Sequence, residues 1–195
     1  MLDPLPCATY AFVMSITPGP NNVMLTAAGA NFGLRRTLPH LLGVWCGFGV
    51  QVAAVCGGLG IVFTRWPQLQ LGLKWVGAGY LVFLGWQMLR SGAGQAGSAG
   101  KPITFAEAAA FQFLNPKAWV MSLTAATLFL PPQLGQALAS GYVAGIVSVV
   151  NLPCITAWAM FGSSLGLVLA RPAARRIFNW VMAMALAATG VMMVA

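Results

Sequence analysis

The chain has 195 residues, of which 59% are hydrophobic and 6% charged, with ten Lys and Arg against two Asp and Glu. So few polar side chains cannot cover a soluble domain of this length, and the composition therefore predicts an integral membrane protein. A net charge of +8 would suggest a nucleic-acid partner in a soluble protein, but here Lys and Arg separate apolar runs instead of clustering among aromatic residues. We expect a lipid bilayer as the partner and no nucleic acid.

A hydrocarbon core about 30 Å thick needs roughly 20 apolar residues of helix to cross it. Apolar runs bounded by Gly, Pro and charged residues predict six spans and an all-α membrane protein. The spans cover residues 6–30, 38–63, 70–90, 104–130, 136–169 and 174–194. Because no Lys or Arg precedes the first run, which follows Asp3, it does not look like a secretory signal peptide, and we expect it to remain as a span.

A stretch of small residues divides the six spans into three and three. Residues 91–100 read SGAGQAGSAG, which is typical of a flexible linker. The sequence therefore predicts one three-helix repeat at 1–90, a cytoplasmic linker at 91–103 and a second three-helix repeat at 104–195.

Basic residues outside the spans predict the orientation of the chain. The loops after the first, third and fifth spans hold Arg35, Arg36, Arg90, Lys101, Arg171, Arg175 and Arg176. The opposite side holds only Arg65 and Lys74. Since Lys and Arg are enriched in cytoplasmic loops, seven against two puts those three loops in the cytoplasm and both termini outside. With three spans in each half, the two halves are then inverted relative to each other.

Prolines interrupt the first and fourth spans at matching positions. Pro18 and Pro116 lie 98 positions apart, and the same shift places Gly43 and Gly47 on Gly141 and Gly145. Broken spans at corresponding positions of two halves point to the central substrate site of a transporter. Glycines four residues apart are small enough to let helices approach closely in lipid, so we interpret both pairs as packing positions.

The first break is the stretch Thr17-Pro18-Gly19-Pro20-Asn21-Asn22. Two prolines remove two backbone donors and push Thr17 towards an extended conformation, so the helix is expected to unwind here. The half-helix that resumes near Pro20 would present amides around Asn21 and Asn22 at its positive end, which favours an anion such as a carboxylate. The alternative interpretation is a kink whose freed backbone groups are satisfied by neighbouring helices.

The second break is Asn115-Pro116-Lys117, which places Lys117 about 20 Å along its span and near the middle of the membrane. An ionisable group at that depth is a functional candidate by default. Lys117 would either bind a substrate carboxylate or release a proton during the cycle. The alternative is that its long side chain reaches an interface or a water-filled cavity.

Other polar residues admit plainer interpretations. Thr104 and Glu107 have the spacing of a capping box at the start of the fourth span, although Glu107 is also a candidate for proton coupling. His40 near the start of the second span could carry a proton, but we interpret it as an interfacial residue. One His and four Cys without a CxxC pair offer no ligand set for a metal or haem, so we expect no metal, no cofactor and no disulfide between Cys46 and Cys56.

At these residues the chain resembles the LysE/RhtB family of amino-acid exporters, in four stretches whose order and spacing cover most of the chain. They are TPGPN at 17–21, GLR at 33–35 followed by Gly43 and Gly47, KWVGAGYL at 74–81 with Gly85, and NPK at 115–117. Asn21-Asn22 and KPITF at 101–105 look most like the cysteine and O-acetylserine exporters. The sixth span departs from them, with Ala183 and Ala187 where such exporters often carry glycine.

The resemblance implies a bacterial inner-membrane carrier that exports amino acids or close metabolites, driven by proton entry. Two other classes stay open at this point. A passive channel or structural subunit would use the same breaks to line a pore, and its flux would need no coupling ion. An enzyme would need a nucleophile with a base or a pair of carboxylates, which one His and two peripheral acids do not provide, so we expect no catalytic activity. The sequence leaves the substrate and the formation of a homo-oligomer open.

Overall fold

A computed structural model describes residues 2–90, 101–166, 169 and 171–194. Every element of regular secondary structure among these residues is a helix or a helical turn. The first half contains α1 (Leu5–Ile16), α2 (Pro20–Phe32), α3 (Leu34–Ala54), a π-helical turn (Val55–Leu59), α4 (Gly60–Arg65) and α5 (Pro67–Arg90). The second contains α6 (Phe105–Phe111), a 3₁₀ turn (Gln112–Leu114), α7 (Pro116–Leu128), α8 (Gln136–Leu165) and α9 (Pro172–Val194). The linker predicted at 91–103 lies mostly outside the described residues.

Prolines determine where several of these helices begin. Pro20, Pro67, Pro116 and Pro172 are the first residues of α2, α5, α7 and α9. This is the position where a proline is favoured, because its missing N–H has no partner in the first turn and its fixed φ already suits a helix. The interruptions predicted near Pro18 and Pro116 are both present, since α1 ends at Ile16 and the turn after α6 ends at Leu114.

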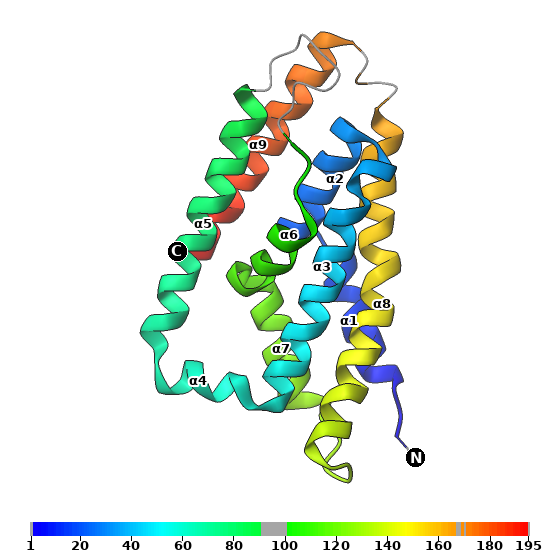
Figure 1. The fold of residues 1–195 in the computed structure, drawn as a ribbon, viewed down its shortest axis with the longest axis vertical. Helices are drawn as coiled ribbons and strands as arrows, with labels where there is room; N and C mark the ends of the chain where they lie inside the picture. The colour runs from blue at the N-terminus through cyan, green and yellow to red at the C-terminus, as the bar shows by residue number, and fades with distance from the viewer. Residues whose placement is uncertain (1, 91–100, 167–168, 170, 195) are drawn as a thin grey trace.

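The chain runs up and down along the long axis of the molecule (Figure 1). The broken pair α1–α2 rises, α3 descends, α5 rises, α6–α7 descends, α8 rises and α9 descends. Among the described residues, Leu34–Val62 and Gln136–Leu165 are each long and apolar enough to cross a membrane. The helical segments match the predicted spans to within a few residues, apart from a kink at Gly58, whose φ of 116° suits glycine.

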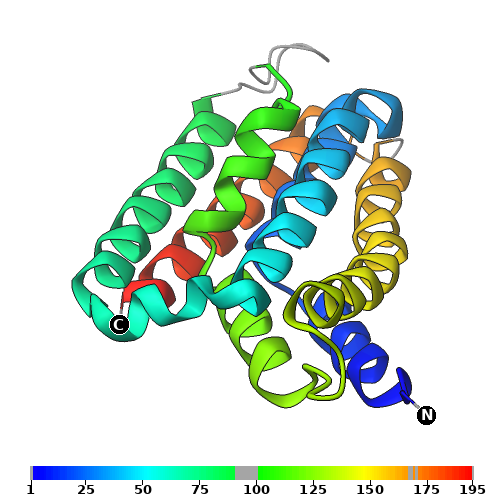
Figure 2. The ribbon, with the colours of Figure 1, turned by 60° about the horizontal axis from the view of Figure 1, so that its bottom comes forward.

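Small residues let the helices approach each other closely. Gly162 of α8 faces Thr26 of α2, and a Cβ on this glycine would lie 2.0 Å from the Thr26 carbonyl oxygen. The long helices α5 and α9 pack along each other on one side of the molecule, opposite α1 and α8 (Figure 2), with Gly85 set against Ala183. The alanine in the sixth predicted span therefore still provides a small contact position.

The two predicted glycine pairs behave differently. Gly43 and Gly47 lie against α6, and a Cβ on Gly43 would come 2.3 Å from the Phe105 carbonyl oxygen. Gly141 and Gly145 are exposed, and nothing outside the helix comes within 4 Å of a Cβ at either position. The packing role predicted for the second pair is therefore wrong within the part of the chain that the structure describes, where no other helix covers that face of α8.

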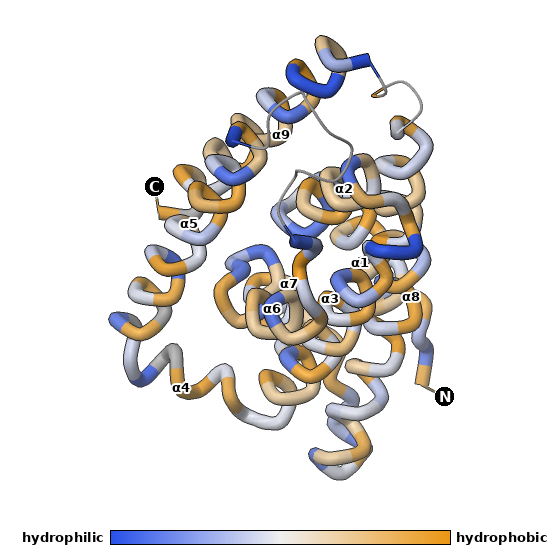
Figure 3. The backbone as a smooth tube through the Cα atoms, turned by 45° about the horizontal axis from the view of Figure 1, so that its top comes forward, coloured by the Kyte–Doolittle hydropathy of each residue, from blue (hydrophilic) through white to orange (hydrophobic). Residues whose placement is uncertain are grey.

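The outer surface is apolar along its length and basic at one end. Exposed tryptophans and other large apolar side chains cover α5 and α9, including Trp75, Trp86 and Trp180. Such a surface would be an aggregation hazard in water but suits contact with lipid. The junction of α2 with α3, the end of α5 and the start of α9 lie at the same end of the molecule, where the tube in Figure 3 turns hydrophilic.

Candidate functional site

The two helix breaks, far apart in sequence, lie against each other. The side-chain amide of Asn21 donates to Gln112 Oε1 at 2.8 Å, and Gln112 Nε2 donates back to Asn21 Oδ1 at 3.2 Å. Lys117 reaches Thr17 from the other side of the junction, at 2.8 Å from its carbonyl oxygen. The breaks are therefore joined by a pair of amides and by an ammonium group, each bridging the two halves of the chain.

Ending α1 leaves its last carbonyls without helical partners, and residues next to the break satisfy some of them. Thr17 Oγ1 donates to Met14 O at 3.0 Å. Asn22, 4% exposed, turns back from the first turn of α2 and donates to Ser15 O at 2.9 Å and to Thr17 O at 2.8 Å. Asn22 is thus a cap that holds the two half-helices in a fixed relation.

Distant residues satisfy the remaining carbonyls. Trp158 of α8 donates its indole N–H to Ile16 O at 3.1 Å. Lys117 Nζ donates to Thr17 O at 2.8 Å, to Thr17 Oγ1 at 2.9 Å and to Pro18 O at 3.2 Å. The carbonyls from Met14 to Pro18 therefore all have donors, as backbone in the interior of a membrane would require in the absence of bulk water.

Gly19 gives the Lys117 side chain room to reach these acceptors. A Cβ on Gly19 would lie 2.8 Å from Lys117 Cδ and 3.1 Å from Nζ. The φ of Gly19 is −174°, an extended angle that any residue can adopt. Glycine is needed here for the close approach of the lysine and not for backbone conformation.

The second break is capped by its own residues. Asn115 is the N-cap of α7, and its Oδ1 accepts from the Lys117 backbone N–H at 3.1 Å. Gln112, which is fully buried, donates to Ala108 O at 2.9 Å besides pairing with Asn21. Trp119 donates its indole N–H to Phe113 O at 2.8 Å. These contacts direct the Lys117 side chain across the junction towards the first break.

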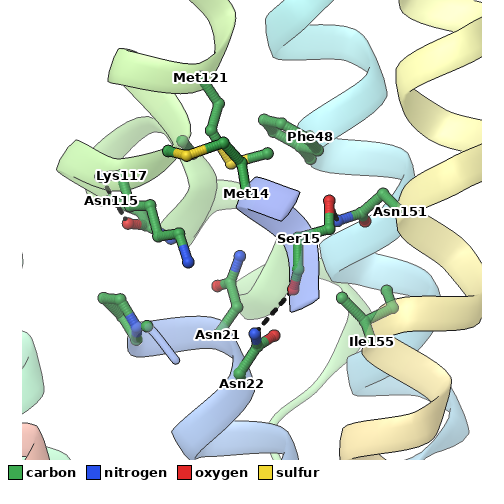
Figure 4. Close-up of a pocket in the computed structure, with 13 residues that line it drawn as sticks. Met14, Ser15, Asn21, Asn22, Phe48, Asn115, Lys117, Met121, Asn151 and Ile155 are labelled. Carbon is green, nitrogen blue, oxygen red and sulfur yellow. Dashed lines mark hydrogen bonds between the residues drawn. The ribbon is translucent and has the colours of Figure 1, made fainter. Parts of the chain in front are cut away.

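Two cavities adjoin Lys117. The inner one, drawn in Figure 4, is lined by polar residues of both breaks together with Met14, Phe48 and Met121. Its volume of about 20 Å³ is room for roughly one water molecule. The outer one has a volume of about 540 Å³ and lies between the breaks and the α5–α9 pair, with Lys74 and Lys117 among mostly apolar residues. Lys117 and Gly19 belong to both linings.

All nine residues predicted for substrate binding lie at this junction: Thr17, Pro18, Gly19, Pro20, Asn21, Asn22, Asn115, Pro116 and Lys117. The sequence reasoning missed Ser15, Gln112 and Asn151. Ser15 Oγ accepts from Asn151 Nδ2 at 3.0 Å, at the wall of the inner cavity. The sequence did contain a signal for Asn151 and Gln112, because each places a polar side-chain amide within an apolar run.

The other two candidates lie away from the junction. Glu107 forms the predicted capping box with Thr104, accepting from its backbone N–H at 2.8 Å while Thr104 Oγ1 accepts from the Glu107 N–H at 3.2 Å. His40 lies in the second turn of α3, and its place at a membrane interface stays a prediction. Its side chain is fully buried with neither ring nitrogen hydrogen-bonded, because Gly43, one turn further along α3, brings the helix close to the first turn of α6.

A helical protein with an apolar outer surface, whose two broken helices meet at a partly buried polar junction, belongs to the class of membrane transport proteins. The sequence of residues 12–195 matches the model of the LysE type translocators, and the chain belongs to this family. The resemblance noted from its motifs is confirmed.

Curated relatives cover most of the chain. The cysteine/O-acetylserine efflux protein of Escherichia coli (strain K12) is 32% identical over 158 residues, which is 79% of each protein. The protein of the same name from Salmonella typhimurium (strain LT2) is 32% identical over 145 residues, 74% of this chain and 72% of the relative. No solved structure matches the chain significantly.

Proposed function

We propose that this protein is a secondary transporter that exports amino acids, or close metabolites, across the bacterial inner membrane. The observation that carries the proposal is the meeting of the two helix breaks, which gathers Thr17, Asn21 and Lys117 at one polar junction. Membership of a translocator family supports it. The relatives' names make cysteine and O-acetylserine the first substrates to test.

The membrane arrangement belongs to the same proposal. We place six spans in the bilayer as two inverted three-helix repeats, at 1–90 and 104–195, with the linker 91–103 in the cytoplasm and both termini outside. The alternation of chain direction in Figure 1 supports this arrangement, as does the gathering of the basic loops at one end.

A zwitterion suits the chemistry of the junction. Its ammonium would take carbonyl oxygens at the first break, such as those of Thr17 and Pro18, which lie in non-helical backbone. Its carboxylate would meet Lys117 or the backbone amides near Asn21 and Asn22, in the first turn of α2. The chain has two acidic residues in all, Asp3 and Glu107, and both lie at helix starts away from the junction.

Proton coupling also stays a proposal. Of the three candidates, Lys117 lies at the site itself, while Glu107 is engaged in its capping box. His40 is buried beside α6 with unpaired ring nitrogens, which leaves it able to accept a proton. We place coupling first at Lys117 and next at His40.

Efflux from proteoliposomes preloaded with a panel of labelled amino acids, with and without a proton gradient, tests the function. A gradient that accelerates the efflux of a small neutral amino acid supports a proton-coupled exporter. Equal efflux with and without the gradient would indicate the passive channel instead. The absence of efflux for every member of the panel would overturn the proposal.

A further inference from the structure

The Lys117 ammonium occupies a site built from acceptors alone. Three oxygen atoms, two from Thr17 and one from Pro18, lie within 3.2 Å of Nζ. We call these three oxygens the cradle. An ammonium has three N–H donors, and here each has an acceptor within reach. The charge therefore sits on carbonyl and hydroxyl dipoles with no carboxylate in the cradle.

We propose that Lys117 is a tethered occupant of the substrate's ammonium subsite. In the empty protein Lys117 fills the cradle. When a zwitterion binds, its ammonium replaces the lysine in the cradle and its carboxylate pairs with the displaced Lys117 ammonium. This inference rests on the proposed function, because it specifies how that site would accept its substrate.

The exchange conserves both charge and hydrogen bonds. A zwitterion carries no net charge, so its insertion between Lys117 and the cradle leaves the net charge of the junction at that of one lysine. The cradle oxygens keep an N–H donor throughout, so the exchange loses no hydrogen bond to them. A ligand with an ammonium but no carboxylate would displace the half-buried Lys117 ammonium from its three acceptors without offering it a new one, and such ligands are thereby disfavoured.

The geometry provides room for the exchange on one side. The inner cavity holds roughly one water while Lys117 is in place. The outer cavity, about 540 Å³, is lined by Pro18, Gly19 and Lys117 and could receive both the ligand and the displaced side chain. The lysine stem crosses Gly19, so a movement of the side chain alone suffices to open the cradle.

Ligand binding to the purified protein tests the inference. L-cysteine is compared with cysteamine, the same molecule without its carboxylate, in wild type and in Lys117→Met. Wild type is expected to bind L-cysteine at least tenfold more tightly than cysteamine. Lys117→Met empties the cradle, so cysteamine should bind at least tenfold more tightly than it binds wild type, and the preference for L-cysteine should disappear.

Three controls isolate the cradle. Lys101→Met removes a lysine that lines neither the inner nor the outer cavity and should bind both ligands as wild type does. n-Propylammonium at about five times its Kd should raise the Tm of Lys117→Met by roughly 2–4 °C, whereas tetramethylammonium, which has no N–H group, should not. Lys117→Ala also removes the ammonium from the cradle, so it should gain amine binding too, and it replaces Lys117→Met if that variant does not fold.

Cysteamine binding that is equal in wild type, Lys117→Met and Lys117→Ala would overturn the inference. Failure of the proposed function can be distinguished from failure of this inference. If the amines bind Lys117→Met but wild type exports no amino acid, the cradle stands and export is rejected. If wild type exports amino acids while neither variant gains amine binding, export stands and the tethered lysine is rejected.

Discussion

The amides of Asn21 and Gln112 form a reciprocal pair, each donating to the oxygen of the other across the junction of the two broken helices. This pair joins α2 to the turn before α7, and Gln112 is fully buried. Because each amide satisfies its partner, removing one leaves the other with unpaired polar atoms in a buried place. The energetic coupling between the two residues is therefore expected to be large.

A double-mutant cycle measures this coupling. Asn21→Ala and Gln112→Ala should each destabilise the protein by about 1–3 kcal/mol. The double variant should cost less than the two single variants together, with a coupling of roughly 0.5–3 kcal/mol. Thermal or denaturant unfolding in detergent gives the values. Additive effects would show that the two amides do not depend on each other.

Asn22→Ala should impair both stability and transport. Asn22 is the cap for the Ser15 and Thr17 carbonyls, and its loss leaves the Ser15 carbonyl without a donor. We expect a loss of about 1–3 kcal/mol and strongly weakened efflux with normal membrane insertion. Asn31→Ala is the matched control, because Asn31 donates only along its own helix, to Ala27 O. Equal behaviour of the two variants would contradict the role of Asn22.

Pro18→Ala should weaken binding by a different route. The proline forces Thr17 into an extended conformation, with ψ of 146°, which directs the Thr17 carbonyl away from the helix and towards Lys117. Alanine lifts this restriction and allows α1 to continue by a residue or two. We expect at least a tenfold loss of substrate affinity, about 1.4 kcal/mol. Pro172→Ala, at the start of α9, should bind and transport normally.

The pattern of helix breaks and spans was readable from the sequence because proline acts locally, through its own backbone and that of its neighbour. The capping box of Glu107 was readable for the same reason. The burial of His40 could not be predicted from the sequence, because it depends on how closely α3 approaches α6. The partner of Lys117 was equally hidden, since Thr17 lies 100 positions earlier and only the packing of the two breaks brings them together.

Two glycines of α8 provide a test of the helix packing. Gly162→Ala should destabilise the protein by more than about 1 kcal/mol, because its Cβ would lie 2.0 Å from the Thr26 carbonyl oxygen and backbone must shift. Gly141→Ala meets nothing within 4 Å and replaces glycine by a better helix former, so it should be neutral or slightly stabilising. The unfolding midpoints of the two variants measure these changes in stability. A larger loss of stability in Gly141→Ala than in Gly162→Ala would contradict the described contact of α2 with α8.

The orientation of the chain follows from the basic loops and can be tested with two cysteines in a cysteine-free background. Gln133→Cys lies between α7 and α8, and Ala173→Cys lies in the first turn of α9 beside Arg171. Because Lys and Arg are retained in the cytoplasm, a membrane-impermeant thiol reagent added to intact cells should label position 133 and spare position 173. Opening the cells should make position 173 reactive. Labelling of both positions in intact cells would contradict the crossing of the membrane by α8, and the inverted arrangement of the two halves would fail with it.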